Sequence, residues 1–348
     1  MTASLQFGID TFGDITVDAA GHLLSHAQVL RNVLAEGIRA DEVGLDFIGI
    51  GEHHREDFAV SAPEVLLAAI AARTERIRLG SAVTVLSSDD PVRVYQRFAT
   101  LDAISNGRAE VILGRGSFTE SFPLFGYPLN QYEQLFEEKL ELFVRLRSEQ
   151  PVTWSGRTRA ALTDQRVFPN AHAIPIPTWI GVGGSPESVI RAAHHRLPLM
   201  LAVIGGDPRR FVPYVQLFHR ALAQANAPRL PVGIHSPGFI AATDAEAERL
   251  MWPAFKAMRD RIGRERGWPP MQRGEFEQEV AHGSLYVGSP ETVARKMAAT
   301  ISSLGLTRFD LKYSAGTLPH EQLLECITLY GTEVVPRVKA LVAQSAAA

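Results

Sequence analysis

The stretch at residues 45–57 reads LDFIGIGEHHRED, a short apolar run followed by ionisable residues. Its apolar run, residues 47–50, has the length and composition of a strand that is buried on both faces. One glycine later the chain presents six ionisable residues in succession, residues 52–57. Strands buried on both faces are typical of parallel sheets and barrels, whose ligands bind beyond the carboxyl ends of the strands. The stretch therefore predicts an α/β protein with reactive side chains at this strand end.

Short apolar runs alternate with helix-length amphipathic segments along the rest of the chain. Eight of these runs are expected to be strands, and they begin at residues 5, 47, 77, 109, 178, 199, 232 and 309. Several of the expected helices start with proline, whose missing N–H costs nothing at the first helical position. Because eight strand–helix units close a barrel, the sequence predicts a (β/α)8 TIM barrel. A doubly wound open sheet is the alternative.

Two insertions interrupt the alternation, one after the fourth strand and one after the seventh. The first contains a stretch rich in Phe, Pro and Gly, residues 117–129, then a helix, and then a proline-containing excursion over 151–177. The second, residues 263–284, is polar and shows no period, which predicts a mobile loop without secondary structure. We expect one domain, residues 1–348, that carries both insertions.

Composition limits the classes of function. The formal net charge is −3, so no basic surface for nucleic acid or for an anionic membrane is expected. The single cysteine, Cys326, rules out a disulfide framework and a thiolate metal cluster within the chain. No leader-like N-terminus and no run of about 18 apolar residues is found, which predicts a cytoplasmic protein.

Five expected strand ends carry polar or glycine-rich groups, and a barrel gathers such ends on one rim. These groups are Asp10, Glu52-His53-His54, Ser87-Ser88-Asp89-Asp90, Gly114-Arg115-Gly116 and Gly183-Gly184-Ser185. The last group precedes a proline-started helix, whose free N–H groups favour a phosphate, and Arg115 offers a fixed cation for it. A serine N-cap and an arginine paired with a carboxylate are the alternatives. The two groups follow neighbouring strands, which favours the phosphate interpretation.

His53 and His54 are adjacent on an extended segment, so their side chains point in opposite directions. They cannot chelate one ion as a helical pair four residues apart can, and we expect no metal site. His53 is interpreted as the proton donor or acceptor that faces the barrel mouth, and His54 as a structural neighbour. A structural role for both is the alternative. His194 and His195 end a helix, where a positive ring complements the helix dipole, and are interpreted as structural.

Further motifs join the Glu52-His53-His54 group in a pattern typical of one protein family. They are residues 76–86 (RIRLGSAVTVL), Asp90-Pro91-Val92-Arg93, Asp102, Asn106-Gly107-Arg108 and Gly114-Arg115-Gly116. Together they resemble the bacterial luciferase-like, flavin-dependent monooxygenases. The resemblance spans about residues 5–340, is most specific over 45–145, and implies a TIM barrel.

The resemblance implies roles for individual residues. His53 matches the catalytic histidine, and Ala82-Val83 falls at a non-prolyl cis peptide beneath the flavin ring. Arg115 and Gly183-Gly184-Ser185 match the groups that hold the FMN phosphate, and Asp10 and Gly114 complete the expected cofactor-binding set. There are two departures: luciferase has a reactive cysteine at the position of Gly114, and an acidic residue and a serine near Gly183 and Gly184.

The function implied is that of an FMN-dependent monooxygenase. Reduced FMN from a separate flavin reductase, together with O2, would oxidise a small organic substrate, and the protein would be a homodimer. Phe118 and Phe122 are expected on the substrate side of the loop after the fourth strand, with core packing as the alternative. An F420-dependent oxidoreductase and a non-catalytic flavin-binding protein are the other possibilities kept open.

Overall fold

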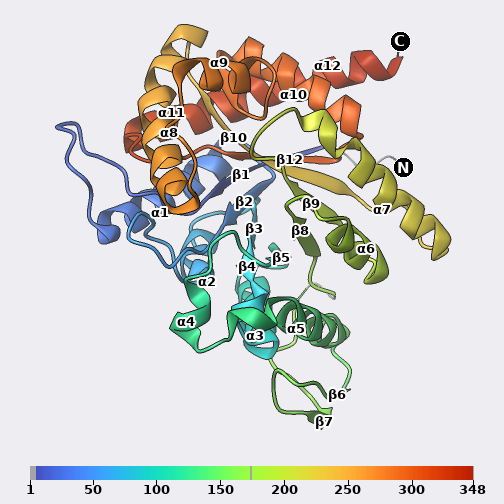
Figure 1. Cartoon of the computed structure of the whole chain (residues 1–348). Helices are drawn as coiled ribbons and strands as arrows, with labels where there is room; N and C mark the ends of the chain where they lie inside the picture. Colours follow the sequence, from blue (N-terminus) through green and yellow to red (C-terminus); the bar gives the residue numbers. More distant parts are fainter. Residues whose placement is uncertain (1–4, 173–174, 348) are drawn as a thin grey trace.

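The computed structural model describes residues 5–172 and 175–347, which form a closed barrel of eight parallel strands wrapped by helices (Figure 1). Strand β10 pairs with both β9 and β12 and so completes the ring. In ring order the strands are β1 (Gln6–Thr11), β2 (Phe47–Ile50), β3 (Arg78–Ser81), β5 (Ala109–Gly114), β8 (Thr178–Val182), β9 (Leu199–Ala202), β10 (Val232–Ile240) and β12 (Arg308–Lys312). The TIM barrel is confirmed, and each strand begins within one residue of its expected start.

The helices that cover the barrel begin largely where proline and capping residues predict. Pro63, Pro91, Pro186 and Pro290 each occupy the first turn of a helix, and Ser185 Oγ accepts the N–H of Ser188. The covering helices are α1 (His26–Glu42), α2 (Pro63–Ala71), α3 (Pro91–Ile104), α5 (Tyr132–Leu146), α6 (Pro186–His194), α7 (Val212–Gln224), α8 (Asp244–Arg266), α10 (Pro290–Leu304), α11 (His320–Leu329) and α12 (Val335–Ala347).

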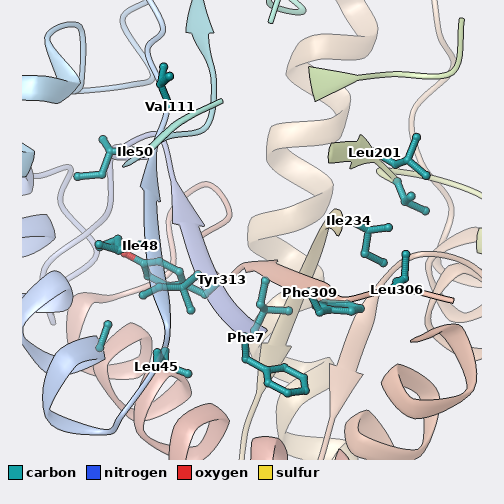
Figure 2. Close-up of a cluster of buried hydrophobic side chains, with 14 of the residues drawn as sticks. Phe7, Leu45, Ile48, Ile50, Val111, Leu201, Ile234, Leu306, Phe309 and Tyr313 are labelled. Carbon is teal, nitrogen blue, oxygen red and sulfur yellow. The ribbon is translucent and has the colours of Figure 1, made fainter. Parts of the chain in front are cut away.

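The main hydrophobic core lies between the outer face of the barrel and its helices. Figure 2 shows part of it, with Phe7, Ile48 and Phe309 projecting from three strands that are neighbours in the ring. These side chains are fully buried. Because the outward positions of the strands are apolar, the inward positions are free to carry polar groups toward the rim.

The interior of the barrel combines a small apolar cluster with a buried charged layer. Phe47, Ile112, Trp179 and Met200 form the apolar cluster. The guanidinium of Arg308 lies 3.6 Å from the centroid of the Phe47 ring and pairs with Glu110 and with Asp310. Burial raises the pKa of Asp310 to about 8, although the charge of Arg308 opposes that shift. The barrel is therefore a filled core, and a ligand has to bind above this layer.

The prediction of a structureless loop over residues 263–284 is wrong. Helix α8 continues to Arg266, helix α9 spans Arg273–Ala281, and strand β11 (Tyr286–Gly288) then pairs with β10. A capping box between Gln272 and Glu275 starts α9, and Phe276 anchors it against Trp252 and Phe255. One buried residue gives a helix no visible period, which is why the sequence pattern missed it.

The first insertion also contains regular structure. Residues 151–177 include an antiparallel pair of strands, β6 (Val152–Trp154) and β7 (Leu162–Gln165), and helix α4 (Ser121–Phe125) lies in the loop after β5. Strand β4 (Thr84–Val85) pairs with the end of β5. Within the part of the chain that the structure describes, no helix is long and apolar enough to span a bilayer.

Candidate active site

The floor of the barrel mouth is formed by Ala82-Val83 and by glycines around it. The expected cis peptide is present between Ala82 and Val83. A Cβ added at Gly114 would lie 2.6 Å from the Val83 side chain, and one at Gly51 would lie 2.5 Å from the Ala82 carbonyl oxygen. A Cβ at Gly181 would also be in tight contact with Val83, at 3.0 Å. These positions cannot accept side chains unless neighbouring atoms shift, so none of the three adds a side chain to the floor around the Ala82-Val83 peptide.

His53 lies at the mouth of the barrel and is surrounded by aromatic side chains. Its ring stacks on Phe12 at 4.3 Å between centroids and meets the edges or faces of Phe58 at 4.6 Å and Phe118 at 4.8 Å. Burial lowers the pKa of His53 to about 3, and the nearby negative charge of Asp14 only partly opposes this. The imidazole is therefore neutral near pH 7, and it can accept or donate a hydrogen bond without carrying a charge.

His54 points elsewhere, as expected for adjacent residues on an extended segment. Its Nε2 lies 3.3 Å from Oε2 of Glu52, and its ring contacts Phe125 of α4 at 5.0 Å. Glu52 Oε1 accepts the backbone N–H of Val85 at 2.6 Å. His54 and Glu52 thus connect the end of β2 to the segment that follows the cis peptide, which is a structural arrangement.

Asp10, an expected cofactor-binding residue, pairs with a histidine that the sequence reasoning missed. Its Oδ2 lies 2.6 Å from Nδ1 of His235, and the carboxyl group is 1% exposed. Its Oδ1 has no hydrogen-bond partner among the described residues. His235 occupies an inward position of β10, and its ring lies 6.2 Å from that of Phe12. A polar residue at an inward position of a buried strand was the available signal.

Lys312 and Asp14 form a second buried pair beside Phe12. Lys312 Nζ lies 2.7 Å from Asp14 Oδ2, which also accepts the hydroxyl of Ser314 at 2.6 Å. Burial alone would raise the pKa of Asp14, but the charge of Lys312 and these hydrogen bonds hold it below its usual value. The pair is already satisfied, so it shapes the local field around His53 and leaves little capacity for a ligand.

The side chain of Arg115 lies close to that of a second arginine, Arg191, near the start of α6. Arg115 Nη2 donates to Ser188 Oγ at 3.2 Å, and Arg191 Nη1 donates to the same oxygen at 3.0 Å. Ser185 Oγ lies 3.1 Å from that hydroxyl, and the carboxylate of Glu133 pairs with both arginines. We call these five residues the arginine cluster. Arg191 was missed from the sequence, although it lies one helical turn after Ser188.

The glycines before α6 leave open space beside the arginine cluster. A Cβ built at Gly183 meets no atom within 4 Å, and the backbone of Gly184 has a φ of +116°, which only glycine adopts readily. The carbonyl of Gly184 accepts the hydroxyl of Tyr214 at 2.8 Å, which fixes the turn. The structure therefore brings Gly183, Gly184 and Ser185 to the same rim as Arg115, as the barrel topology requires.

The two expected substrate-side phenylalanines have different surroundings. Phe118 contacts His53, and the guanidinium of Arg55 lies 4.4 Å from the centroid of the Phe118 ring. Arg55 also pairs with Glu120 and Glu265, so the loop after β5 is clamped to the end of α8. Phe122 is fully buried and packs on Tyr132 at 5.6 Å. Only Phe118 is thus brought to the mouth beside His53.

Within the described ranges, no group of three or more His, Cys, Asp or Glu side chains has the geometry of a metal site. A sequence model described as luciferase-like monooxygenase matches residues 11–308. The chain belongs to this family. It is accordingly an enzyme of the flavin-dependent oxidoreductase class.

Relatives of this luciferase-like monooxygenase vary in how much of their length matches. Two uncharacterised proteins of Sinorhizobium fredii are 31% identical over 39% of each chain and 24% identical over 97% of this chain and 98% of the relative. The alkanal monooxygenase alpha chain of Photorhabdus luminescens is 27% identical over 56% of this chain and 53% of its own length.

Solved structures share the fold of this luciferase-like chain over nearly its whole length. Monooxygenase RslO1 of Streptomyces bottropensis has a TM-score of 0.82 at 24% identity, covering 95% of this chain and 99% of that one. The oxygenating constituent of 3,6-diketocamphane monooxygenase of Pseudomonas putida, in complex with FMN, scores 0.79 at 18% identity, with coverages of 96% and 99%. The F420-dependent tetrahydromethanopterin reductase of Methanopyrus kandleri scores 0.73 at 19% identity, with coverages of 97% and 100%.

Proposed function

We propose that this enzyme is an FMN-dependent monooxygenase that uses reduced flavin from a separate reductase, together with O2, to oxidise a small organic substrate. The observation that carries the proposal is the presence, on one rim, of a low floor at Ala82-Val83 and of the arginine cluster. A planar ring with a phosphate-bearing tail needs both features. Family membership and the FMN complex of a structural neighbour support the same cofactor.

The residues present fit such a cofactor. Gly114 has no side chain at the floor, where the cofactor ring has to approach the backbone. A Cβ at this position would be in close contact with Val83. Arg115, Arg191 and Ser188 offer donors for a phosphate, beside the open space at Gly183. When bound, reduced flavin supplies the two electrons with which one oxygen atom of O2 enters the substrate and the other becomes water.

The side chains around His53 have two tasks in this proposal. Phe12, Phe58 and Phe118 surround the imidazole and exclude water from the reacting atoms. His53, which is neutral because burial lowers its pKa to about 3, donates or accepts a hydrogen bond at a ring nitrogen during the reaction. A small and mainly apolar substrate suits this aromatic compartment.

The deazaflavin F420 is the second candidate cofactor. A structural neighbour that covers 97% of the chain is an F420-dependent reductase, and the same floor and arginine cluster would serve its ring and its phosphate. A homodimer accompanies the first proposal as an expectation from the resemblance, and a cytoplasmic location accompanies it as an expectation from the sequence.

Binding and oxygen uptake test the proposal. The purified protein is titrated with FMN and with F420, and oxygen consumption is then followed with reduced FMN and a panel of aldehydes, ketones and sulfur compounds. Removing a charged hydrogen-bond partner costs about 1.5–3 kcal/mol, so Arg115→Ala should weaken FMN binding roughly 10- to 100-fold. Arg145→Ala, an exposed arginine of α5 that pairs with Glu141, is the matched control. Equal FMN affinities for wild type and Arg115→Ala would remove Arg115 from the site.

A further inference from the structure

Glu133 is the one acidic member of the arginine cluster that contacts both guanidinium groups. It pairs with Arg115 through Oε1, and its Oε2 lies 3.4 Å from Nη2 of Arg191. The donors that it engages are among those that a bound phosphate would use. The carboxylate of Glu133 therefore occupies donors of the two arginines that an anion would otherwise bind.

Glu133 is also the most exposed member of the cluster. Its side chain is 63% exposed, whereas those of Arg115 and Arg191 are 22% and 8% exposed. Its hydrogen-bond partners among the described residues are these two arginines. An exposed ion pair of this kind contributes little to stability, so the carboxylate can swing into solvent at small cost.

Both arginines are held in place by contacts that do not involve Glu133. Arg115 lies 5.1 Å from the centroid of the Tyr132 ring and donates to Ser188. Arg191 pairs with Glu137, lies 5.4 Å from the centroid of the Phe136 ring, and also donates to Ser188. If Glu133 leaves, the two guanidinium groups stay where they are and their donors become available.

We propose that Glu133 is a placeholder for the cofactor phosphate: its carboxylate competes with the phosphate for the donors of the two arginines and is displaced when the phosphate binds. This inference rests on the proposed function, since it requires a phosphate-bearing cofactor. Glu133 and a phosphate compete for the same donors and repel one another, so the placeholder weakens binding and speeds release. Rapid exchange suits a flavin that arrives reduced from another protein and leaves oxidised.

The test compares Glu133→Gln with wild type, using FMN and riboflavin as probes. The amide keeps the size of the side chain and removes its charge. We expect FMN to bind roughly 5- to 30-fold more tightly and to dissociate more slowly, because a negative charge near the phosphate is gone. Riboflavin has no phosphate, and its affinity should stay within about twofold. Glu141→Gln, on the same helix and paired only with Arg145 in the described structure, should change neither affinity.

Two further measurements separate displacement from other effects. The gain in FMN affinity should shrink at high salt, because the charges are partly exposed and are screened. It should also shrink in an Arg115→Ala background, because the competition acts largely through that arginine. An unchanged melting temperature for Glu133→Gln shows that the comparison is between folded proteins.

The outcomes distinguish this inference from the proposed function. If wild type binds FMN and Glu133→Gln binds it equally or less tightly, then Glu133 orients Arg115 for the phosphate, and the placeholder is refuted while the cofactor assignment stands. If riboflavin affinity rises as much as FMN affinity, the placeholder is likewise refuted. If neither protein binds FMN or F420, the proposed function fails, and the inference fails with it.

Discussion

Two regions of the same rim differ in almost every physical property. The surround of His53, at the ends of β1 and β2, is aromatic and closed, and it keeps its central imidazole neutral. The arginine cluster, at the ends of β5 and β8, is charged and open, and the exposed carboxylate of Glu133 pairs with both of its arginines. We therefore expect that cofactor affinity and turnover can be changed independently on this scaffold.

The largest expected effect comes from a substitution at His53, which lies outside the arginine cluster. His53→Ala should lower turnover with a true substrate by about 10²–10³-fold, because a positioned hydrogen-bonding group is lost from the reacting centre. The affinity for FMN should remain within about threefold, since the arginine cluster is untouched. Stopped-flow oxidation and equilibrium titration measure the two quantities. A variant with full turnover would refute the catalytic role, and a large loss of FMN affinity would refute the separation of the regions.

A smaller effect tests the floor that joins the two regions. Gly114→Ala places a Cβ 2.6 Å from Val83, so the free energy of unfolding should fall by about 1–3 kcal/mol through overpacking. Gly183→Ala meets no atom within 4 Å and should change stability by less than about 0.5 kcal/mol. Urea denaturation of both variants gives the comparison. Equal effects would mean that the floor has more freedom to relax than its contacts indicate.

The smallest expected effect is the part of the pH dependence of stability that comes from His53. Burial lowers the pKa of His53 to about 3, so the unfolded chain binds a proton at this residue below its usual pKa of 6.5 and the folded chain does not. Stability from this residue is therefore complete above pH 6.5 and is lost as the pH falls toward 3. Between pH 7 and pH 5.5 the loss should be about 1 kcal/mol.

Denaturation of His53→Gln at both pH values checks this sign, because the variant should lose that part of the pH dependence. His22→Gln, at a side chain that is 81% exposed, is the control. The sign is wrong if wild type and His53→Gln lose the same stability on acidification.

The sequence predicted the barrel and much of the rim because both follow from local patterns. Apolar runs and proline-started helices are readable residue by residue, and parallel topology then gathers the strand ends at one face. The pairing of Asp10 with His235 was not readable, because 225 residues separate them and only the closed ring makes them neighbours. Arg191 was missed for a related reason. Its place in the cluster depends on ion pairs with Glu133 and Glu137, which lie on another helix.

Helix α9 was hidden for a different physical reason. A helix that buries one residue, Phe276, shows no apolar stripe, and the run of polar residues around it is typical of a loop. The capping box at Gln272 and Glu275 was the only local signal.

The clamp at Arg55 also has a consequence for biosynthesis. Arg55 joins Glu120 to Glu265, while Lys312 and His235 complete the surroundings of Phe12. The arginine cluster, in contrast, draws only on residues 115–191. During synthesis from the N-terminus, every side chain of the arginine cluster is therefore added before His235, Glu265 and Lys312 are. The surroundings of His53 are thus the later of the two regions to receive all their side chains.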